Sequence, residues 1–286
     1  MVLLKAQDVV SRLANMILYG DSGTGKTYLC SRLPNVLLLD FDEGLRSIPK
    51  DMIVGEGTVA GIREVFSSSR EEHPSIAITL HDISQLLPVL ECLRDKRFAG
   101  RFDTVVLDSV TLLVESVEVY MKTKFSKALT RDSISDDSTS KVPVLTLQGW
   151  GVALDRVKTR LIEFKQLPMN VIFTLHEETM RSEERSWTYP KLKGKAMLPT
   201  LQAMVDFGIR VEVNSGVVQG KRVVRRQLRC GFTTEVWSKA RDSEGGLLKE
   251  VEPADLTALI QKINFGVDKS KDVVEEPELE PVKTNE

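Results

Sequence analysis

The sequence predicts an α/β fold in which a mostly parallel central sheet is flanked by helices and extended by antiparallel hairpins near the C-terminus. Two observations support this prediction. Short apolar runs rich in branched residues recur between helix-like stretches, which is the pattern of a parallel sheet wrapped by helices. From about residue 205 the pattern changes to alternating segments separated by turn residues, which is typical of antiparallel hairpins.

Four buried strands and four helices are expected in the first part of the chain. The strands are predicted at residues 15–19, 36–40, 104–107 and 171–175, and the helices at about residues 26–33, 82–97, 109–125 and 147–166. In the last helix, apolar residues recur at steps of three and four and form one face, namely Trp150, Leu154, Val157, Leu161 and Phe164. Asp82 is expected to cap its helix by accepting hydrogen bonds from free backbone N–H groups.

The C-terminal part is expected to contain two hairpin strands and a closing helix. The strands are predicted at residues 205–213 and 223–229, broken by the turn-forming residues 214–216 and 219–220. The helix is predicted at residues 253–263.

The chain is expected to form one main domain over residues 1–266, followed by a tail. Residues 267–286 contain seven acidic residues, three basic residues and two prolines. Such a segment cannot bury enough apolar surface to order itself, so we predict a disordered acidic tail. With 286 residues and 42% apolar content, the rest of the chain can bury one large core.

Charge and cysteine usage narrow the possible classes of protein. The formal net charge is only -2, so a nucleic-acid site must be a local basic patch. Cys30, Cys92 and Cys230 are far apart and lack metal-site spacing, which argues against a disulfide framework and against a zinc site. We find neither an apolar run of about 18 residues nor the features of a signal peptide, so we expect a soluble cytoplasmic protein without membrane association.

The most specific motif is GDSGTGKT at residues 20–27, which directly follows an apolar strand and opens a helix. Its glycines allow the backbone to approach closely, so that successive N–H groups can surround phosphate oxygens. Lys26 is expected to bridge the terminal phosphates of ATP, and the Thr27 hydroxyl to bind Mg²⁺. The expected nucleotide-binding residues are Gly20, Asp21, Ser22, Gly23, Thr24, Gly25, Lys26 and Thr27.

Acidic and polar residues follow three other predicted strands. Asp108 ends the strand at residues 104–107, and we expect it to bind the water shell of the magnesium ion at the carboxyl edge of the sheet. Asp42 or Glu43 is the candidate base that activates water, whereas the neighbouring Asp40 could be structural. His176 follows residues 171–175 and is a candidate contact to the terminal phosphate.

These motifs resemble the RecA-like P-loop ATPases of bacteriophages, including the single-strand-annealing recombination ATPases. The resemblance covers roughly residues 12 to 265 and depends on GDSGTGKT, LLLDFDEGLRSIP, VVLDSVTLL, QGWG, VIFTLHEE and SKAR. It implies a RecA-like ATPase domain that hydrolyses ATP with Mg²⁺. It places Asp42 at the position of the water-activating acidic residue, where RecA-type proteins usually have glutamate. It also places His176 where recombinases have a glutamine that couples phosphate state to a DNA-binding loop.

The resemblance also implies a homo-oligomer. Lys239 and Arg241 look like the Lys-x-Arg pair that KaiC-like and DnaB-like relatives insert into the ATP site of a neighbouring subunit. Two cations at this spacing on a strand would point the same way and could stabilise charge on the transferred phosphate. Without the resemblance, the same pair would be interpreted as a solvated basic strand end.

A loop-like segment that follows His176 combines cations with aromatic residues. This composition suits sequence-independent binding of single-stranded DNA, in which cations track phosphates and aromatic rings stack on bases. The candidate DNA-binding residues are Arg181, Arg185, Trp187, Tyr189, Lys191, Lys193 and Lys195. The basic run at residues 221–229 is interpreted instead as decoration of a hairpin, and residues 126–141 as a second mobile loop.

The sequence thus predicts an ATPase, stimulated by DNA, that acts on single-stranded DNA in phage-type recombination, annealing or replication. A single-strand-binding protein is an expected partner of the acidic tail, and the host cytoplasm is the expected location if the chain is phage-encoded. Two alternatives remain open at this point. One is a P-loop small-molecule kinase, and the other is an ATP-switched assembly factor that acts on proteins without binding DNA.

Overall fold

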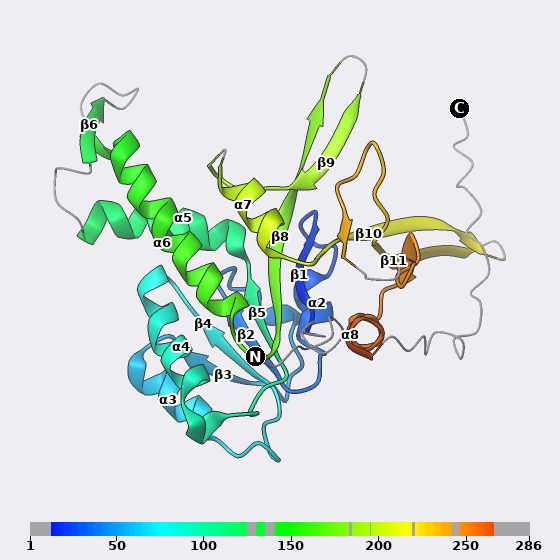
Figure 1. Cartoon of the computed structure of the whole chain (residues 1–286), viewed down its shortest axis with the longest axis horizontal. Helices are drawn as coiled ribbons and strands as arrows, with labels where there is room; N and C mark the ends of the chain where they lie inside the picture. The colour runs from blue at the N-terminus through cyan, green and yellow to red at the C-terminus, as the bar shows by residue number, and fades with distance from the viewer. Residues whose placement is uncertain are drawn as a thin grey trace, which may run out of the picture.

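The computed structural model describes residues 13–124, 130–134, 141–182, 185–194, 196–218, 221–241 and 246–265. Eleven strands form one sheet, in which the order along the main path is β13-β11-β10-β1-β8-β5-β2-β4-β3 (Figure 1). The strands from β10 to β3 pair in parallel, whereas β11, β12, β13 and β9 pair antiparallel to their neighbours. The predicted α/β fold with antiparallel C-terminal hairpins is therefore confirmed.

The strands of the sheet have the following bounds: β1 Asn15–Gly20, β2 Val36–Asp40, β3 Ile53–Glu56, β4 Ile76–Thr79, β5 Thr104–Asp108, β8 Asn170–Arg181, β9 Ser186–Pro190, β10 Phe207–Val218, β11 Lys221–Arg229, β12 Lys239–Ala240 and β13 Val251–Pro253. The helices are α2 Lys26–Cys30, α3 Val59–Ser67, α4 Leu86–Arg94, α5 Val110–Lys124, α6 Leu147–Lys165, α7 Met197–Met204 and α8 Leu256–Phe265. Three short 3₁₀ turns lie at Leu45–Ser47, Ile83–Gln85 and Lys96–Phe98. A separate two-stranded sheet pairs β6 Thr130–Ile134 with β7 Lys141–Leu145.

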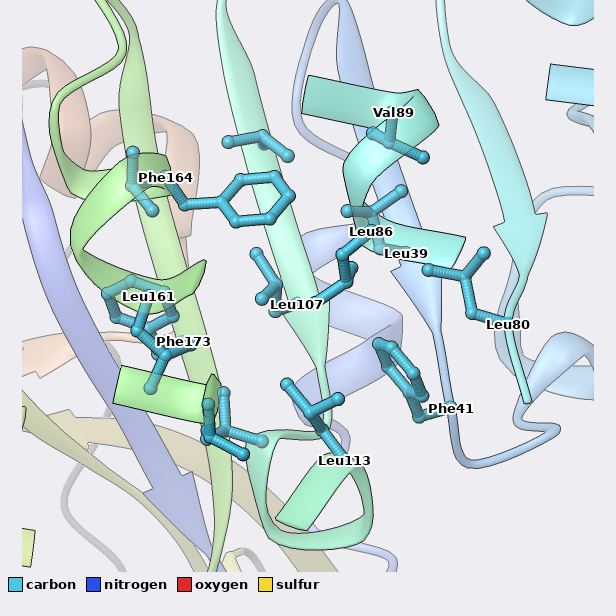
Figure 2. Packing of buried hydrophobic residues seen from close by; sticks show 14 of the residues in the cluster. Leu39, Phe41, Leu80, Leu86, Val89, Leu107, Leu113, Leu161, Phe164 and Phe173 are labelled. Atoms are coloured by element: carbon cyan, nitrogen blue, oxygen red, sulfur yellow. The ribbon is translucent and has the colours of Figure 1, made fainter. Parts of the chain in front are cut away.

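Side chains of the central strands alternate between two apolar layers, as expected for a sheet covered on both faces. One layer packs β1, β2, β5 and β8 against α3, α4, α5, α6 and α7. Figure 2 shows part of it, with Leu39 on β2, Leu107 on β5 and Phe164 on α6 facing one another. The other layer packs the opposite face of the sheet against α2 and α8. This two-sided burial holds the carboxyl ends of the strands in fixed positions.

The elements predicted with the strongest patterns agree with the structure. The four predicted strands correspond to β1, β2, β5 and the first half of β8, and the predicted helices at residues 109–125 and 147–166 correspond to α5 and α6. In α6, Val157, Leu161 and Phe164 are buried, whereas Trp150 and Leu154 are only partly buried at the edge of the same layer. Asp82 accepts a hydrogen bond from the N–H of Ser84 and caps the 3₁₀ turn before α4.

Several element boundaries were predicted wrongly. The helix after the P-loop ends at Cys30 rather than at residue 33. Residues 82–97 form two 3₁₀ turns around α4 rather than one helix, and the closing helix starts at Leu256 because residues 251–253 pair with β11 as β13. The prediction also missed β3 and β4, which are only four residues long and therefore carry little periodic signal.

Strands occupy two segments that were predicted to be a turn and a loop. β10 runs through the predicted turn at residues 214–216, because β11 pairs with it from Arg210 to Val218 and satisfies its backbone hydrogen bonds. Part of the segment predicted as a mobile loop at residues 126–141 forms β6 and the start of β7. Residues 219–220 and the tail predicted to be disordered at residues 267–286 lie outside the described residues.

Candidate active site

The predicted site residues meet at the carboxyl edge of the sheet because the parallel strands β1, β2 and β5 end there, beside His176 in the longer strand β8. In the register of these strands, Gly20 on β1 lies beside His176 on β8, and Asp40 on β2 lies beside Asp108 on β5. β8 and β5 are themselves neighbours, so His176 and the ends of β1, β2 and β5 form one continuous row. Residues up to 156 positions apart in sequence are thereby brought to one site.

The P-loop has the backbone conformation that its glycines predict. Gly23 and Gly25 adopt positive φ angles of 78° and 96°, which are strained for residues with a Cβ. Lys26 is buried, and its Nζ donates hydrogen bonds to the carbonyl oxygens of Gly20 at 3.0 Å and Asp21 at 2.9 Å. Burial lowers the pKa of Lys26, although nearby carboxylates, chiefly that of Asp108, act in the opposite direction.

Asp108 connects the P-loop helix to two strands. Its Oδ2 accepts a hydrogen bond from Thr27 Oγ1 at 2.5 Å, and its Oδ1 accepts one from Thr174 Oγ1 at 2.5 Å. The carboxylate is almost completely buried, and this burial raises its pKa, whereas the two hydroxyl donors act to lower it. Thr174 was not predicted, and the sequence around it gives no signal for this contact beyond its place near the end of a strand.

The oxygen-rich surroundings of Thr27 suit Mg²⁺, which prefers carboxylate, hydroxyl, water and phosphate oxygens. The two predicted ligands, Thr27 and Asp108, are in direct contact. Asp40 adds a third oxygen donor nearby: its Oδ2 is buried without a hydrogen-bond partner among the described residues. Within the same residues, no three or more His, Cys, Asp or Glu side chains are grouped to hold a metal on their own. These residues therefore suit a metal ion whose remaining ligands are phosphate and water oxygens.

Asp42 and His176 are brought together, whereas Glu43 lies exposed on the surface. Asp42 Oδ2 lies 3.4 Å from His176 Nε2, and Asp42 Oδ1 accepts a hydrogen bond from Ser109 Oγ at 3.0 Å. Glu43 is exposed and has a positive φ of 53°. Of the two acidic candidates, Asp42 is thus the one whose carboxylate is held within the row of strand ends.

Comparison with known proteins agrees with this geometry. The family model described as an AAA domain matches residues 12–241. The chain belongs to the AAA domain family. This membership supports the predicted P-loop ATPase and its use of a nucleotide, and it covers every predicted site residue from Gly20 to Arg241.

Among solved structures, this AAA domain is similar to the flagellar accessory protein FlaH from Methanocaldococcus jannaschii, with 12% identity, 83% of each chain covered and a TM-score of 0.38. It is also similar to the KaiC-like protein PH0186 from Pyrococcus horikoshii OT3, with 13% identity, 74% of this chain and 77% of that chain covered, and a TM-score of 0.36. No curated protein matches the sequence. In the described part of this AAA domain, no helix has both the length and the apolar character needed to cross a lipid bilayer.

The predicted cation pair Lys239 and Arg241 does not project as a pair from this AAA domain. Lys239 Nζ donates hydrogen bonds to the carbonyl oxygens of Gln202 at 2.6 Å and Val205 at 2.7 Å, at the C-terminal end of α7. In this chain a helix end holds the ammonium group of Lys239, and the entry of this residue into a neighbouring subunit stays a prediction. Arg241 remains 57% exposed and lies 3.5 Å from Asp206.

The segment predicted as a DNA-binding loop is a β-hairpin. β8 continues past His176 to Arg181 and pairs with β9, so that the hairpin stands out from the body of the molecule (Figure 1). The loop prediction was wrong because Thr179, Trp187 and Thr188 favour extended backbone and find cross-strand partners. The N–H of Thr188 donates to the carbonyl oxygen of Glu235, and the carbonyl oxygen of Thr188 accepts from the N–H of Trp237, so these two bonds hold the other edge of β9.

The candidate DNA-binding residues are distributed unevenly over this hairpin. Arg181 and Arg185 are exposed, and the rings of Trp187 and Tyr189 stack with a centroid distance of 5.0 Å. Lys193 is instead paired with Glu118 at 2.5 Å. Lys191 follows the hairpin, where its N–H donates to the carbonyl oxygen of His176. Lys195 lies outside the described residues.

A hollow borders the tip of the P-loop, and Lys26 and Thr27 are not among its lining residues. It has a volume of about 770 Å³ and is lined by residues 21–24, 210–214 and 233–236 together with Glu177 and Arg229. In it, Arg210 makes a two-pronged ion pair with Glu177 at 2.8 and 3.0 Å, and Glu212 pairs with both Arg210 and Arg229. This network ties the residue after His176 to the β10–β11 hairpin.

The basic run at residues 221–229 makes a contact with the P-loop that was not predicted. Arg226 Nε donates a hydrogen bond to the carbonyl oxygen of Thr24 at 3.0 Å. No local signal distinguishes Arg226 from the other cations of this run. The pairing of β10 with both β1 and β11 brings it to the site.

Proposed function

We propose that this chain is an ATPase that acts on single-stranded DNA in recombination, annealing or replication of the phage type, in the cytoplasm of the host cell if it is phage-encoded. The observation that supports this most is the continuity of β8. One strand carries Thr174, which contacts Asp108, then His176, which contacts Asp42, and then the exposed arm of the hairpin.

The residues at the strand ends have separable tasks in ATP hydrolysis. The P-loop amides and Lys26 would bind the phosphates, and Thr27 and Asp108 would hold Mg²⁺, with the Asp40 carboxylate near them. When bound, Mg²⁺ supplies charge neutralisation for the phosphate oxygens. Asp42 orients and deprotonates the attacking water, and His176 holds the Asp42 carboxylate in place.

Hydrogen bonds at the base of the hairpin connect His176, the proposed phosphate contact, to the two strands of the proposed DNA-binding hairpin. The His176 N–H donates to Thr111 Oγ1, which in turn donates to the carbonyl oxygen of Lys191, and the Lys191 N–H donates to the carbonyl oxygen of His176. A displacement of His176 on loss of the terminal phosphate would therefore move both ends of the hairpin base together.

The hairpin itself has surface chemistry that suits single-stranded DNA. Trp187 is 37% exposed and stacks on Tyr189, and Met180, which pairs with Trp187 across the hairpin, is 58% exposed. Arg181 and Arg185 are exposed near the hairpin tip, so two cations lie close in sequence to these aromatic and apolar side chains. Stacking of bases on aromatic rings beside cations binds single strands without sequence preference.

The proposal includes a homo-oligomer in which the ATP site is shared between subunits. Arg241, which is exposed next to β12, is a candidate to enter a neighbouring site. A single-strand-binding protein is the proposed partner of the acidic tail.

The test is ATP turnover measured with and without single-stranded DNA. Wild type should be stimulated by DNA, Lys26→Ala should lose turnover, and Trp187→Ala should lose DNA affinity and stimulation while its basal turnover remains. Phe232→Ala is a matched control, because this aromatic residue is also exposed but lies outside the hairpin. Nucleotide-dependent assembly without DNA binding would instead favour an ATP-switched assembly factor, and phosphate transfer to a small acceptor would favour a kinase.

A further inference from the structure

Arg226 on β11 lies against the P-loop of its own chain. Besides the hydrogen bond to Thr24, its guanidinium group covers Gly25. A Cβ built at Gly25 would lie 2.8 Å from Arg226 Nε and 3.5 Å from Arg226 Cζ. The cation is thus held within van der Waals distance of the backbone that surrounds the phosphates.

The guanidinium group of Arg226 also lies over the aromatic ring of Tyr28. Arg226 Cζ lies 5.6 Å from the centroid of the Tyr28 ring, and Arg32 Cζ lies 3.4 Å from the same centroid. Arg32 also donates to the carbonyl oxygens of Tyr28 and Ser47. The terminal nitrogens of Arg226, in contrast, have no hydrogen-bond or ion-pair partner within the described ranges.

The sheet determines which residue of the basic run reaches this place. Arg226 pairs with Val213 of β10, and side chains alternate along a strand, so Arg226 shares a face with Leu228, which packs in the same layer as α2. Arg225 and Gln227 point to the opposite face, where the ion network of Glu212 lies. β11 therefore presents one cation to the P-loop and its neighbour to the other side of the sheet.

We infer that Arg226 is a nucleotide-binding residue supplied from within the same chain, with its terminal nitrogens donating to phosphate oxygens of the nucleotide bound by residues 20–27. This inference rests on the proposed ATP binding. A guanidinium group has five donors, of which Nε–H is used by Thr24, and its planar fork matches the oxygens of a phosphate group. The bond to the P-loop backbone fixes the cation before the nucleotide arrives, which reduces the entropy lost on binding.

The experiment is a titration of each purified full-length variant with a fluorescently labelled ATP in Mg²⁺, followed by fluorescence anisotropy. Arg226→Ala should weaken binding about tenfold, the size expected for loss of one charge-assisted hydrogen bond. Arg225→Ala removes the same charge from the opposite face of β11 and should bind within about twofold of wild type. Arg226→Lys keeps the charge and the stem but not the fork, and should weaken binding about threefold.

The outcomes separate this inference from the proposed function. If wild type binds, Lys26→Ala does not, and Arg226→Ala binds like wild type, the inference is overturned while ATP binding stands. If wild type itself does not bind, the proposed function fails first. If Arg226→Ala is unfolded by circular dichroism, Arg226→Lys decides, since unchanged affinity of that variant would contradict recognition by the fork.

Discussion

Asp40 allows a direct test of how much stability this site loses by burying a carboxylate. The side chain is fully buried, and although the N–H groups of Asp42 and Gly44 donate to its Oδ1, its Oδ2 is buried without a partner in the described part of the chain. Burial raises the pKa of Asp40 from 3.8 to about 6, because the charged form loses its hydration. Replacement by asparagine keeps the Oδ1 acceptor and removes the charge.

The raised pKa predicts the direction and size of the effect on stability. Below pH 3.8, Asp40 is neutral in both the folded and the unfolded chain and costs nothing. As the pH rises from about 4 to about 6, the unfolded chain ionises first, so the folded state loses stability relative to it, and above pH 6 the penalty is constant. The difference between a pKa of about 6 and 3.8 corresponds to about 3 kcal/mol.

Urea denaturation of wild type and Asp40→Asn between pH 4 and pH 8, without nucleotide, measures this penalty. The variant should be more stable than wild type by about 3 kcal/mol at pH 7.5 and by less than about 1 kcal/mol at pH 4. Asp155→Asn, on the exposed face of α6, is the matched control. A stability difference for Asp40→Asn that is the same at every pH, or that grows toward acid pH, would refute the reasoning.

Three further predictions concern contacts of the fold and the site. Glu177→Gln breaks the two-pronged pair with Arg210, and should lower the free energy of unfolding by about 1–3 kcal/mol in urea; an unchanged value would show that solvent already screens the pair. Lys239→Met removes two hydrogen bonds to the end of α7 and should cost about 2 kcal/mol; unchanged stability combined with lost turnover would support its role at a neighbouring ATP site. Phe173→Ala empties a fully buried position between the sheet and α6, and should cost about 3–5 kcal/mol, measured as a lower urea midpoint; a cost below about 1 kcal/mol would contradict the packing in Figure 2.

Local sequence was sufficient to predict the elements that depend on residues close together in the chain. The branched apolar runs of β1, β2, β5 and β8 identify buried parallel strands, and the stripe of α6 identifies its buried face. The backbone shape of the P-loop was predictable at Gly23 and Gly25, because their positive φ angles favour glycine at positions that the motif itself specifies. The position of Asp108 at the carboxyl edge of the sheet was predictable because this residue ends a buried strand.

The hairpin after His176 is an element that local sequence did not predict. Its residues were recognised as cationic and aromatic, but an extended arm and a polar loop differ only in whether cross-strand partners exist, and β9 supplies them. The same dependence on partners explains the uninterrupted β10 and the missed β3 and β4. Strand pairing is not local, so short or polar strands leave little trace in composition.

The sequence by itself determined that this chain carries a P-loop with an acidic partner on an α/β scaffold. Only the tertiary structure decided which charged groups share that site: Asp42 rather than Glu43 meets His176, Lys239 is held by α7, and Arg226 reaches the P-loop from a strand about 200 residues away. The reason is physical. A side chain's charge is a property of one residue, whereas its partners depend on strand order and register, which are fixed by the packing of the whole sheet.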